Sequence, residues 1–79
     1  MPTDEEVVET AAEAAQGFVF SSLAKSDVED LDVTVSFEEG ELMVDVYVFA
    51  PEVDEDVQQI ADDAALTARA AVDDLFDQG

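Results

Sequence analysis

Hydrophobic positions recur at three- and four-residue intervals through the first quarter of the chain, with acidic residues opposite them. The stripe consists of Val7, Val8, Ala11, Ala15, Phe18, Val19 and Ser22. This spacing places the stripe on one face of an α-helix. Thr3 and Glu6 have the spacing of a capping box, which satisfies free amide groups at a helix start. The pattern predicts a helix over residues 4–23, in which Gly17 marks either a close helix contact or an early end.

The middle of the chain changes to a period of two, which is typical of half-buried strands. In residues 29–38 the apolar set is Leu31, Val33, Val35 and Phe37. In residues 41–50 the matching set is Leu42, Val44, Val46 and Val48. Gly40 lies in the short turn between them, where a residue that adopts positive φ is favoured. The two segments predict a β-hairpin that ends before Pro51.

A second helical pattern follows the hairpin. Its apolar stripe consists of Val57, Ile60, Ala61, Ala64, Ala68, Ala71, Val72 and Leu75. Asp54 precedes this stripe and is a favourable N-cap residue, so we predict a helix from Asp54 to about Phe76.

The predicted element order is α-β-β-α within a single domain, residues 1–79. Both helices can pack on one face of the hairpin, which gives a two-layer α+β sandwich. A sheet of two strands is weak when it stands alone. Edge-to-edge dimerisation into four strands would complete it, and the alternative is a third strand at the end of the first predicted helix.

Charge adds an expectation about the environment. The chain has 22 acidic residues against two basic ones, Lys25 and Arg69, so its net charge is −20. Such a charge is found in disordered acidic tails, but 48% of the residues are hydrophobic and their spacing is regular. We therefore favour a folded, halophilic protein, because the Debye length falls to about 3 Å in molar salt and screens the repulsion between carboxylates.

Missing residue types narrow the chemistry. The chain has no cysteine and no histidine, and its carboxylates follow no calcium-loop pattern. We predict solvated acidic faces with diffuse monovalent cations, no metal site, no cofactor and no catalytic residue. Two cations cannot replace the counterions of a nucleic acid, so direct nucleic-acid binding is not expected. The acidic start and the short apolar runs predict a cytoplasmic protein without membrane contact.

Large apolar residues at polar positions are the strongest candidates for an interaction surface. Met43, Tyr47 and Phe49 alternate on the side of the hairpin that faces away from the predicted helices, and Phe20 falls on the polar side of the first helix. Exposed apolar patches usually mark protein–protein surfaces. The alternative is that these side chains fill a wider core.

Arg69 is the remaining candidate, at the margin of the apolar stripe of the second helix. The simplest interpretation is an ion pair with Asp73, four residues later, or with a carboxylate of the first helix. The functional alternative is that Arg69 anchors the carboxylate of a partner or the phosphate of a nucleotide.

Three segments resemble a small archaeal family of uncharacterised proteins with acidic haloarchaeal members. They are TDEEVVETAAEAA, DLDVTVSFEEGELMVDVYV and ADDAALTARAAVDDLF. The resemblance implies an αββα domain of unknown function and supplies no functional residues.

These observations favour a non-enzymatic interaction module, acting as a homodimer or as a subunit of a protein complex. The alternative is a protein that binds a small ligand or a nucleotide through Arg69 or Lys25.

The charge generates a first prediction. The melting temperature should rise as KCl increases from low salt to molar concentration, because screening removes the repulsion between surface carboxylates. Thermal unfolding followed by circular dichroism over a KCl series measures this dependence. A melting temperature that does not change with salt would contradict the halophilic interpretation.

Overall fold

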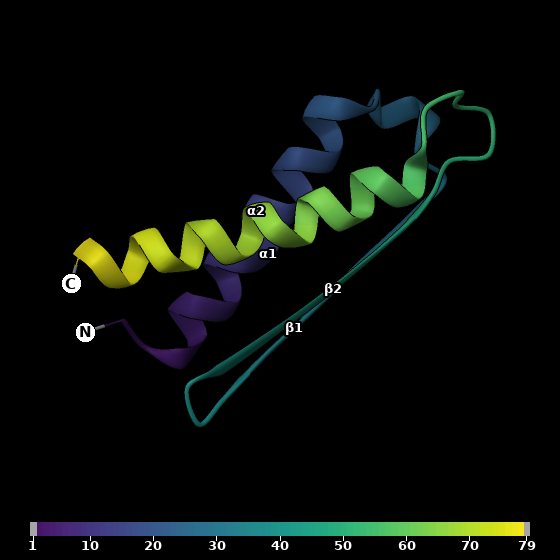
Figure 1. The fold of residues 1–79 in the computed structure, drawn as a ribbon. Coiled ribbons are helices and arrows are strands. Elements are labelled where there is room, and N and C mark those ends of the chain that lie inside the picture. Colours follow the sequence, from purple (N-terminus) through teal and green to yellow (C-terminus); the bar gives the residue numbers. More distant parts are fainter. Residues whose placement is uncertain (1, 79) are drawn as a thin grey trace.

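Two helices cover one face of a two-stranded antiparallel sheet and leave its other face bare (Figure 1). The computed structural model describes residues 2–78. Its elements are α1 (Asp4–Ser22), the 3₁₀ turn η1 (Lys25–Asp27), β1 (Asp30–Glu38), β2 (Glu41–Phe49) and α2 (Val57–Gln78). The predicted two-layer αββα sandwich is confirmed. Within the described residues the sheet has two strands, and the segment offered as a third strand belongs to α1.

The hairpin register follows from its tight turn. Glu38 pairs with Glu41, and Asp30 pairs with Phe49 at the far end of the ladder. Both turn residues have positive φ, 52° at Glu39 and 81° at Gly40. This geometry matches the right-handed twist of the strands. All inward positions of the hairpin are therefore aligned on the side that the helices cover.

The core between the layers is built mainly from small side chains. The buried residues are Val7, Ala11, Ala15, Val19, Leu23, Val48, Ala50, Ala61, Ala64, Ala68 and Val72. Half-buried residues of the inward strand face, from Leu31 to Val46, pack against this cluster. Alanine side chains let the two helices approach each other and the sheet closely. The layer is consequently thin, with Val7 and Val19 as its largest fully buried side chains.

Two details at the helices differ from the sequence-based expectations. α2 begins at Val57, and the Asp56 carboxylate accepts a hydrogen bond from the Gln59 amide at 3.2 Å. Asp56 is therefore the N-cap, and the assignment to Asp54 was wrong because several acidic residues in a row can each cap a helix. Gly17 neither ends α1 nor marks a close contact, since no heavy atom outside its own stretch of the helix lies within 4 Å of a Cβ placed there.

Arg69 joins α2 to the edge of β2. Its Nη2 donates a hydrogen bond to the carbonyl oxygen of Leu42 at 3.2 Å. In an antiparallel ladder alternate residue pairs exchange hydrogen bonds, and the two-residue turn makes Glu38–Glu41 one of these pairs. The carbonyl of Leu42 therefore points away from β1 and is free to accept from Arg69. The expected pairing of Arg69 with Asp73 or an α1 carboxylate is replaced by this backbone contact.

The cap assignment is testable with a matched pair of variants. Asp56→Ala should lower the free energy of unfolding by about 1 kcal/mol, because the Gln59 amide loses its acceptor. Asp54→Ala removes an equal charge without removing the cap, so it should change stability by less than about 0.5 kcal/mol. Denaturant unfolding in molar KCl measures both values. Equal losses would show that Asp56 is not the cap.

Arg69→Ala should also lower the free energy of unfolding, by about 1 kcal/mol, because the contact with Leu42 is lost. Asp73→Ala serves as the control, since it leaves that contact intact and removes only a carboxylate from an acidic helix. The same denaturant experiment compares the two variants. If Asp73→Ala were as destabilising as Arg69→Ala, an ion pair rather than the backbone contact would explain the role of Arg69.

Candidate functional site

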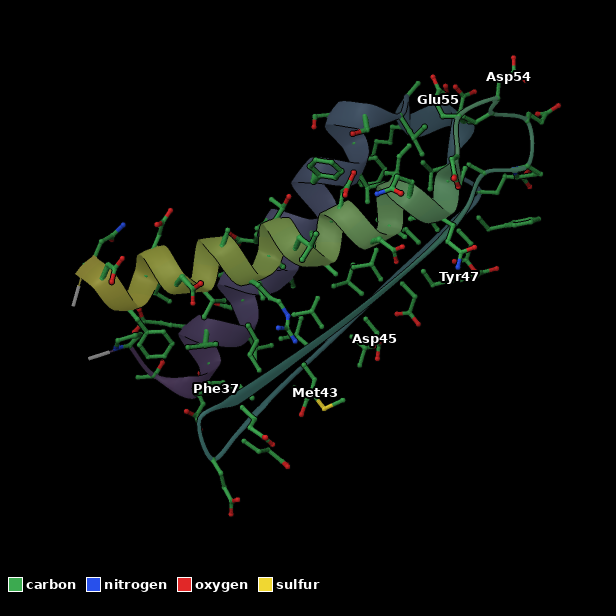
Figure 2. All side chains as sticks on the ribbon, in the orientation of Figure 1. Phe37, Met43, Asp45, Tyr47, Asp54 and Glu55 are labelled. Carbon is green, nitrogen blue, oxygen red and sulfur yellow. The ribbon has the colours of Figure 1, made fainter. Side chains whose placement is uncertain are left out.

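The uncovered face of the hairpin carries three large apolar side chains from β2. Met43 is 61% exposed, Tyr47 54% and Phe49 46%. They occupy alternate positions of one strand, so they project to the same side. Figure 2 shows Met43 and Tyr47 on the side of the hairpin opposite the helices, together with Asp45. We call Met43, Tyr47 and Phe49 the β2 row.

The facing strand leaves the β2 row uncovered. Phe49 lies opposite Asp30, Tyr47 opposite Asp32, and Met43 opposite Ser36. Each apolar side chain thus has a short polar neighbour that cannot shield it. An apolar side chain gains free energy in proportion to the area it buries, about 25 cal/mol per Å². The β2 row is therefore a surface on which another molecule can bury apolar area.

Phe20 does not belong to this surface. It lies on α1, in the layer on the other side of the sheet, and is 36% exposed. The Nζ of Lys25 lies 5.6 Å from the centroid of the Phe20 ring, within the range of a cation–π interaction. The four aromatic and methionine candidates therefore separate into the β2 row and a local Phe20–Lys25 contact.

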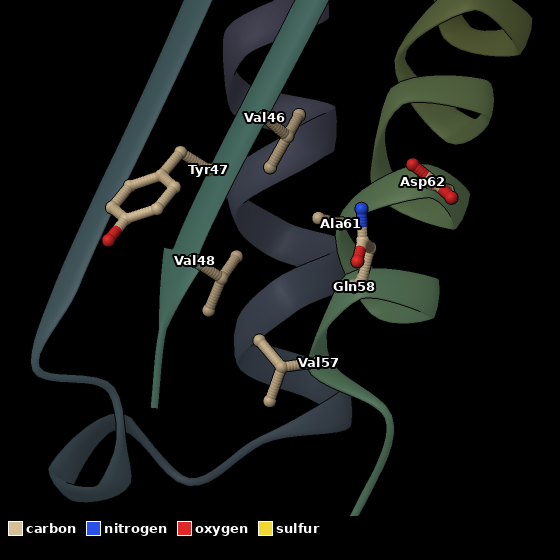
Figure 3. A pocket seen from close by; sticks show the side chains of 7 residues that line it. All are labelled: Val46, Tyr47, Val48, Val57, Gln58, Ala61 and Asp62. Carbon is tan, nitrogen blue, oxygen red and sulfur yellow. The ribbon is translucent and has the colours of Figure 1, made fainter. Parts of the chain in front are cut away.

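A cavity of about 330 Å³ opens between β2 and the first turns of α2. Its lining residues are Val46, Tyr47, Val48, Val57, Gln58, Ala61 and Asp62. Figure 3 shows Val46 and Val48 on the helix side of β2 and Tyr47 on the opposite side. Neither Arg69 nor Lys25 lines this cavity. The structure therefore does not bring either cation to the site where a small ligand would fit.

Among residues 2–78, Leu66 is the most exposed large apolar residue, at 64%. It lies one helical turn after Asp62 and three residues before Arg69, so the three share one flank of α2. The contact of Arg69 with Leu42 shows that this flank faces the free edge of β2. Leu66 was recognisable from the sequence as an apolar residue on a polar face. The cavity and the strand edge beside it had no sequence signal, because residues distant in the chain build them.

Among residues 2–78 no group of three or more acidic side chains is placed to hold a metal ion. Within that range no polar or charged residue is buried, and no buried side-chain nitrogen or oxygen lacks a hydrogen-bond partner. In the same range no helix combines the length and apolarity that crossing a bilayer requires.

Comparison with known proteins shows the family and the fold. A family model described as "Protein of unknown function (DUF3194)" matches residues 3–75. An uncharacterised protein of the haloarchaeon Natronomonas pharaonis is 47% identical over 76 residues, which cover 96% of this chain and 90% of that relative.

Two solved structures are similar over 99% of this chain. A crystal structure from Thermococcus onnurineus NA1 has a TM-score of 0.78 and 29% identity, with 82% of that chain covered. The solution structure of a hypothetical protein from Methanothermobacter thermautotrophicus has a TM-score of 0.77 and 21% identity, with 92% covered, and shows the fold alone. Since the family model spans residues 3–75 and the haloarchaeal relative is 47% identical, the chain belongs to the DUF3194 family of proteins of unknown function.

Proposed function

We propose that this protein is a non-enzymatic interaction module, a small subunit that binds another protein in a high-salt cytoplasm. The observation that carries the proposal is the β2 row. These three large apolar side chains lie on a sheet face that neither helix covers, and each is about half exposed or more. Apolar patches of this kind usually mark protein–protein interaction sites, and aromatic residues and Met are enriched in interfaces.

The charge of the chain supports an apolar rather than an ionic binding mode. In molar salt, attraction between oppositely charged surfaces is screened within about 3 Å. Burial of apolar area does not depend on charge and keeps its driving force. A protein with a net charge of −20 that works in such a medium would therefore bind its partner mainly through residues such as Tyr47 and Phe49.

A second candidate function is the binding of a small ligand in the cavity beside α2. Its volume of about 330 Å³ is at the lower limit for ligand pockets. Gln58 and Asp62 supply its polar side chains, because the Tyr47 side chain lies on the opposite side of β2 (Figure 3). A carboxylate without a neighbouring cation disfavours a nucleotide or any other anion, so this candidate is restricted to a small neutral or cationic molecule.

The interaction proposal can be tested by capture with matched variants. The tagged protein is incubated with a haloarchaeal lysate in molar KCl, and bound proteins are quantified by mass spectrometry. Tyr47→Ser/Phe49→Ser should reduce recovery of a stoichiometric partner by at least about tenfold, since central aromatic contacts in an interface are commonly worth more than 1.4 kcal/mol.

Phe20→Ser is the control, because it removes an exposed aromatic side chain from the other layer. It should leave recovery unchanged. The proposal is wrong if no stoichiometric partner is recovered, or if the double variant retains the partner as well as the control does. Circular dichroism of each variant establishes that the fold is intact before capture.

A further inference from the structure

The two free edges of the hairpin differ in what lies beside them. On the uncovered face, β1 presents Asp30, Asp32, Thr34, Ser36 and Glu38, all exposed. Charged and short polar side chains along an edge strand discourage pairing with another chain. β2 presents the β2 row at the corresponding positions. The hairpin is thus protected along the β1 edge and apolar along the β2 edge.

Backbone groups are available along most of the β2 edge. Hydrogen-bonded and non-hydrogen-bonded residue pairs alternate along the ladder, and Leu42 belongs to a non-hydrogen-bonded pair. Val44, Val46 and Val48 belong to pairs of the same kind, so their amide and carbonyl groups also point away from β1. The Leu42 carbonyl already accepts a hydrogen bond from Arg69. For Val44, Val46 and Val48, the described residues provide no further backbone partner on that side. The free edge therefore consists of three residues whose backbone groups point away from β1, and it ends at the Arg69 contact.

The β2 row lies on one side of this edge, and the flank of α2 that carries Gln58, Asp62 and Leu66 lies on the other side. Gln58 and Asp62 line the cavity between α2 and β2 (Figure 3). Leu66 lies one turn further along the same flank and is 64% exposed. Apolar surface is thus exposed on both sides of a single strand edge, Leu66 and the cavity on the helix side and the β2 row on the other.

We propose that the β2 edge binds one extended segment of a partner protein, which adds as a third, antiparallel strand. This inference rests on the proposed function and specifies its binding mode. In strand addition, backbone hydrogen bonds supply affinity and pockets for alternate side chains supply specificity. Here Val44, Val46 and Val48 supply the backbone groups, and the cavity beside Gln58 receives an aliphatic side chain.

The side chains that the bound segment needs follow from the two surfaces beside the edge, which are the α2 flank and the β2 row. Residues paired with Val44, Val46 and Val48 would point to the helix side, because directly paired residues of an antiparallel ladder share a face. These positions require aliphatic side chains. Residues between them would lie beside the β2 row and Asp45 on the uncovered face. A long basic side chain fits there, with its stem on the apolar row and its charge near a carboxylate.

A second copy of this chain fits the edge less well than a separate segment. Neighbouring strands lie about 4.8 Å apart, whereas packed helices need about 8–10 Å between their axes. α2 already packs over β2, so two copies joined through this edge would bring their α2 helices into the same space. A segment without a helix layer avoids this conflict.

The test uses a blocked seven-residue peptide of alternating Val and Lys as the probe, titrated into the ¹⁵N-labelled protein in KCl sufficient for folding. Binding should shift the amide resonances of Val44, Val46 and Val48 and slow their hydrogen exchange at least about tenfold. Two N-methylated peptides are the chemical controls. Methylation of the Val nitrogens removes the donors that face β2 and should abolish binding, whereas methylation of the Lys nitrogens should not. If both methylated peptides bind as well as the parent, strand addition is wrong.

A matched pair of variants locates the groove on the protein. Gln58 and Gln59 are both exposed, but Gln58 lines the cavity, whereas the Gln59 side chain donates to the Asp63 carboxylate at 3.0 Å. Gln58→Trp should fill the groove and weaken peptide binding at least about tenfold, while Gln59→Trp should not. Equal binding by both variants would place the peptide elsewhere and overturn the inference.

The same variants separate this inference from the proposed function. Retention of a captured partner by Gln58→Trp, together with its loss from Tyr47→Ser/Phe49→Ser, would support the interaction module and overturn strand addition. Sedimentation of the unliganded protein tests whether a second copy of the chain occupies the edge. A dimer that Gln58→Trp dissociates would assign the edge to a second copy and overturn the proposal of a separate segment.

Discussion

A sheet of only two strands, covered on one face, is the constraint on which the rest of this structure depends. Such a sheet supplies a narrow apolar surface, so the helices must approach closely to bury enough area. Alanine at Ala11, Ala15, Ala64 and Ala68 permits this approach, and all four are fully buried. The resulting core is thin and uses every inward position of the hairpin. Neither helix covers the second face, so its large side chains Met43, Tyr47 and Phe49 remain exposed.

That constraint explains why the candidate surfaces gather around β2. Because there are two strands, each has one free edge, and because there is one helix layer, each has one uncovered face. On β1 the uncovered face beside the free edge carries acidic or short polar side chains, such as Asp32 and Thr34. Along β2 the uncovered face carries Tyr47, and among the described residues the free edge is occupied only at Leu42, by Arg69. The difference between the β1 and β2 sides lies in the side chains, since the backbone hydrogen-bonding pattern of a hairpin is the same for both strands.

The sequence predicted what depends on local periodicity. The periods of 3.6 and 2 identified the helices and strands to within a few residues and separated the two faces of the hairpin, including the side on which Met43 projects. It did not distinguish Asp54 from Asp56 as the cap, because both residue types and positions suit a helix start. The partner of Arg69 could not be inferred, because a backbone carbonyl has no residue identity. The cavity beside Gln58 depends on how α2 lies across β2, which no local pattern encodes.

The two cations show how this chain uses charge. Lys25 lies over the Phe20 ring, and Arg69 donates to a backbone carbonyl on another element. Both contacts join a cation to an uncharged group. Screening by salt weakens attraction between exposed charges most strongly at long range, so contacts of this kind persist in a medium where surface ion pairs contribute little. In a chain with 22 acidic residues, the two basic side chains thus form contacts between elements, Lys25 of η1 with α1 and Arg69 of α2 with β2.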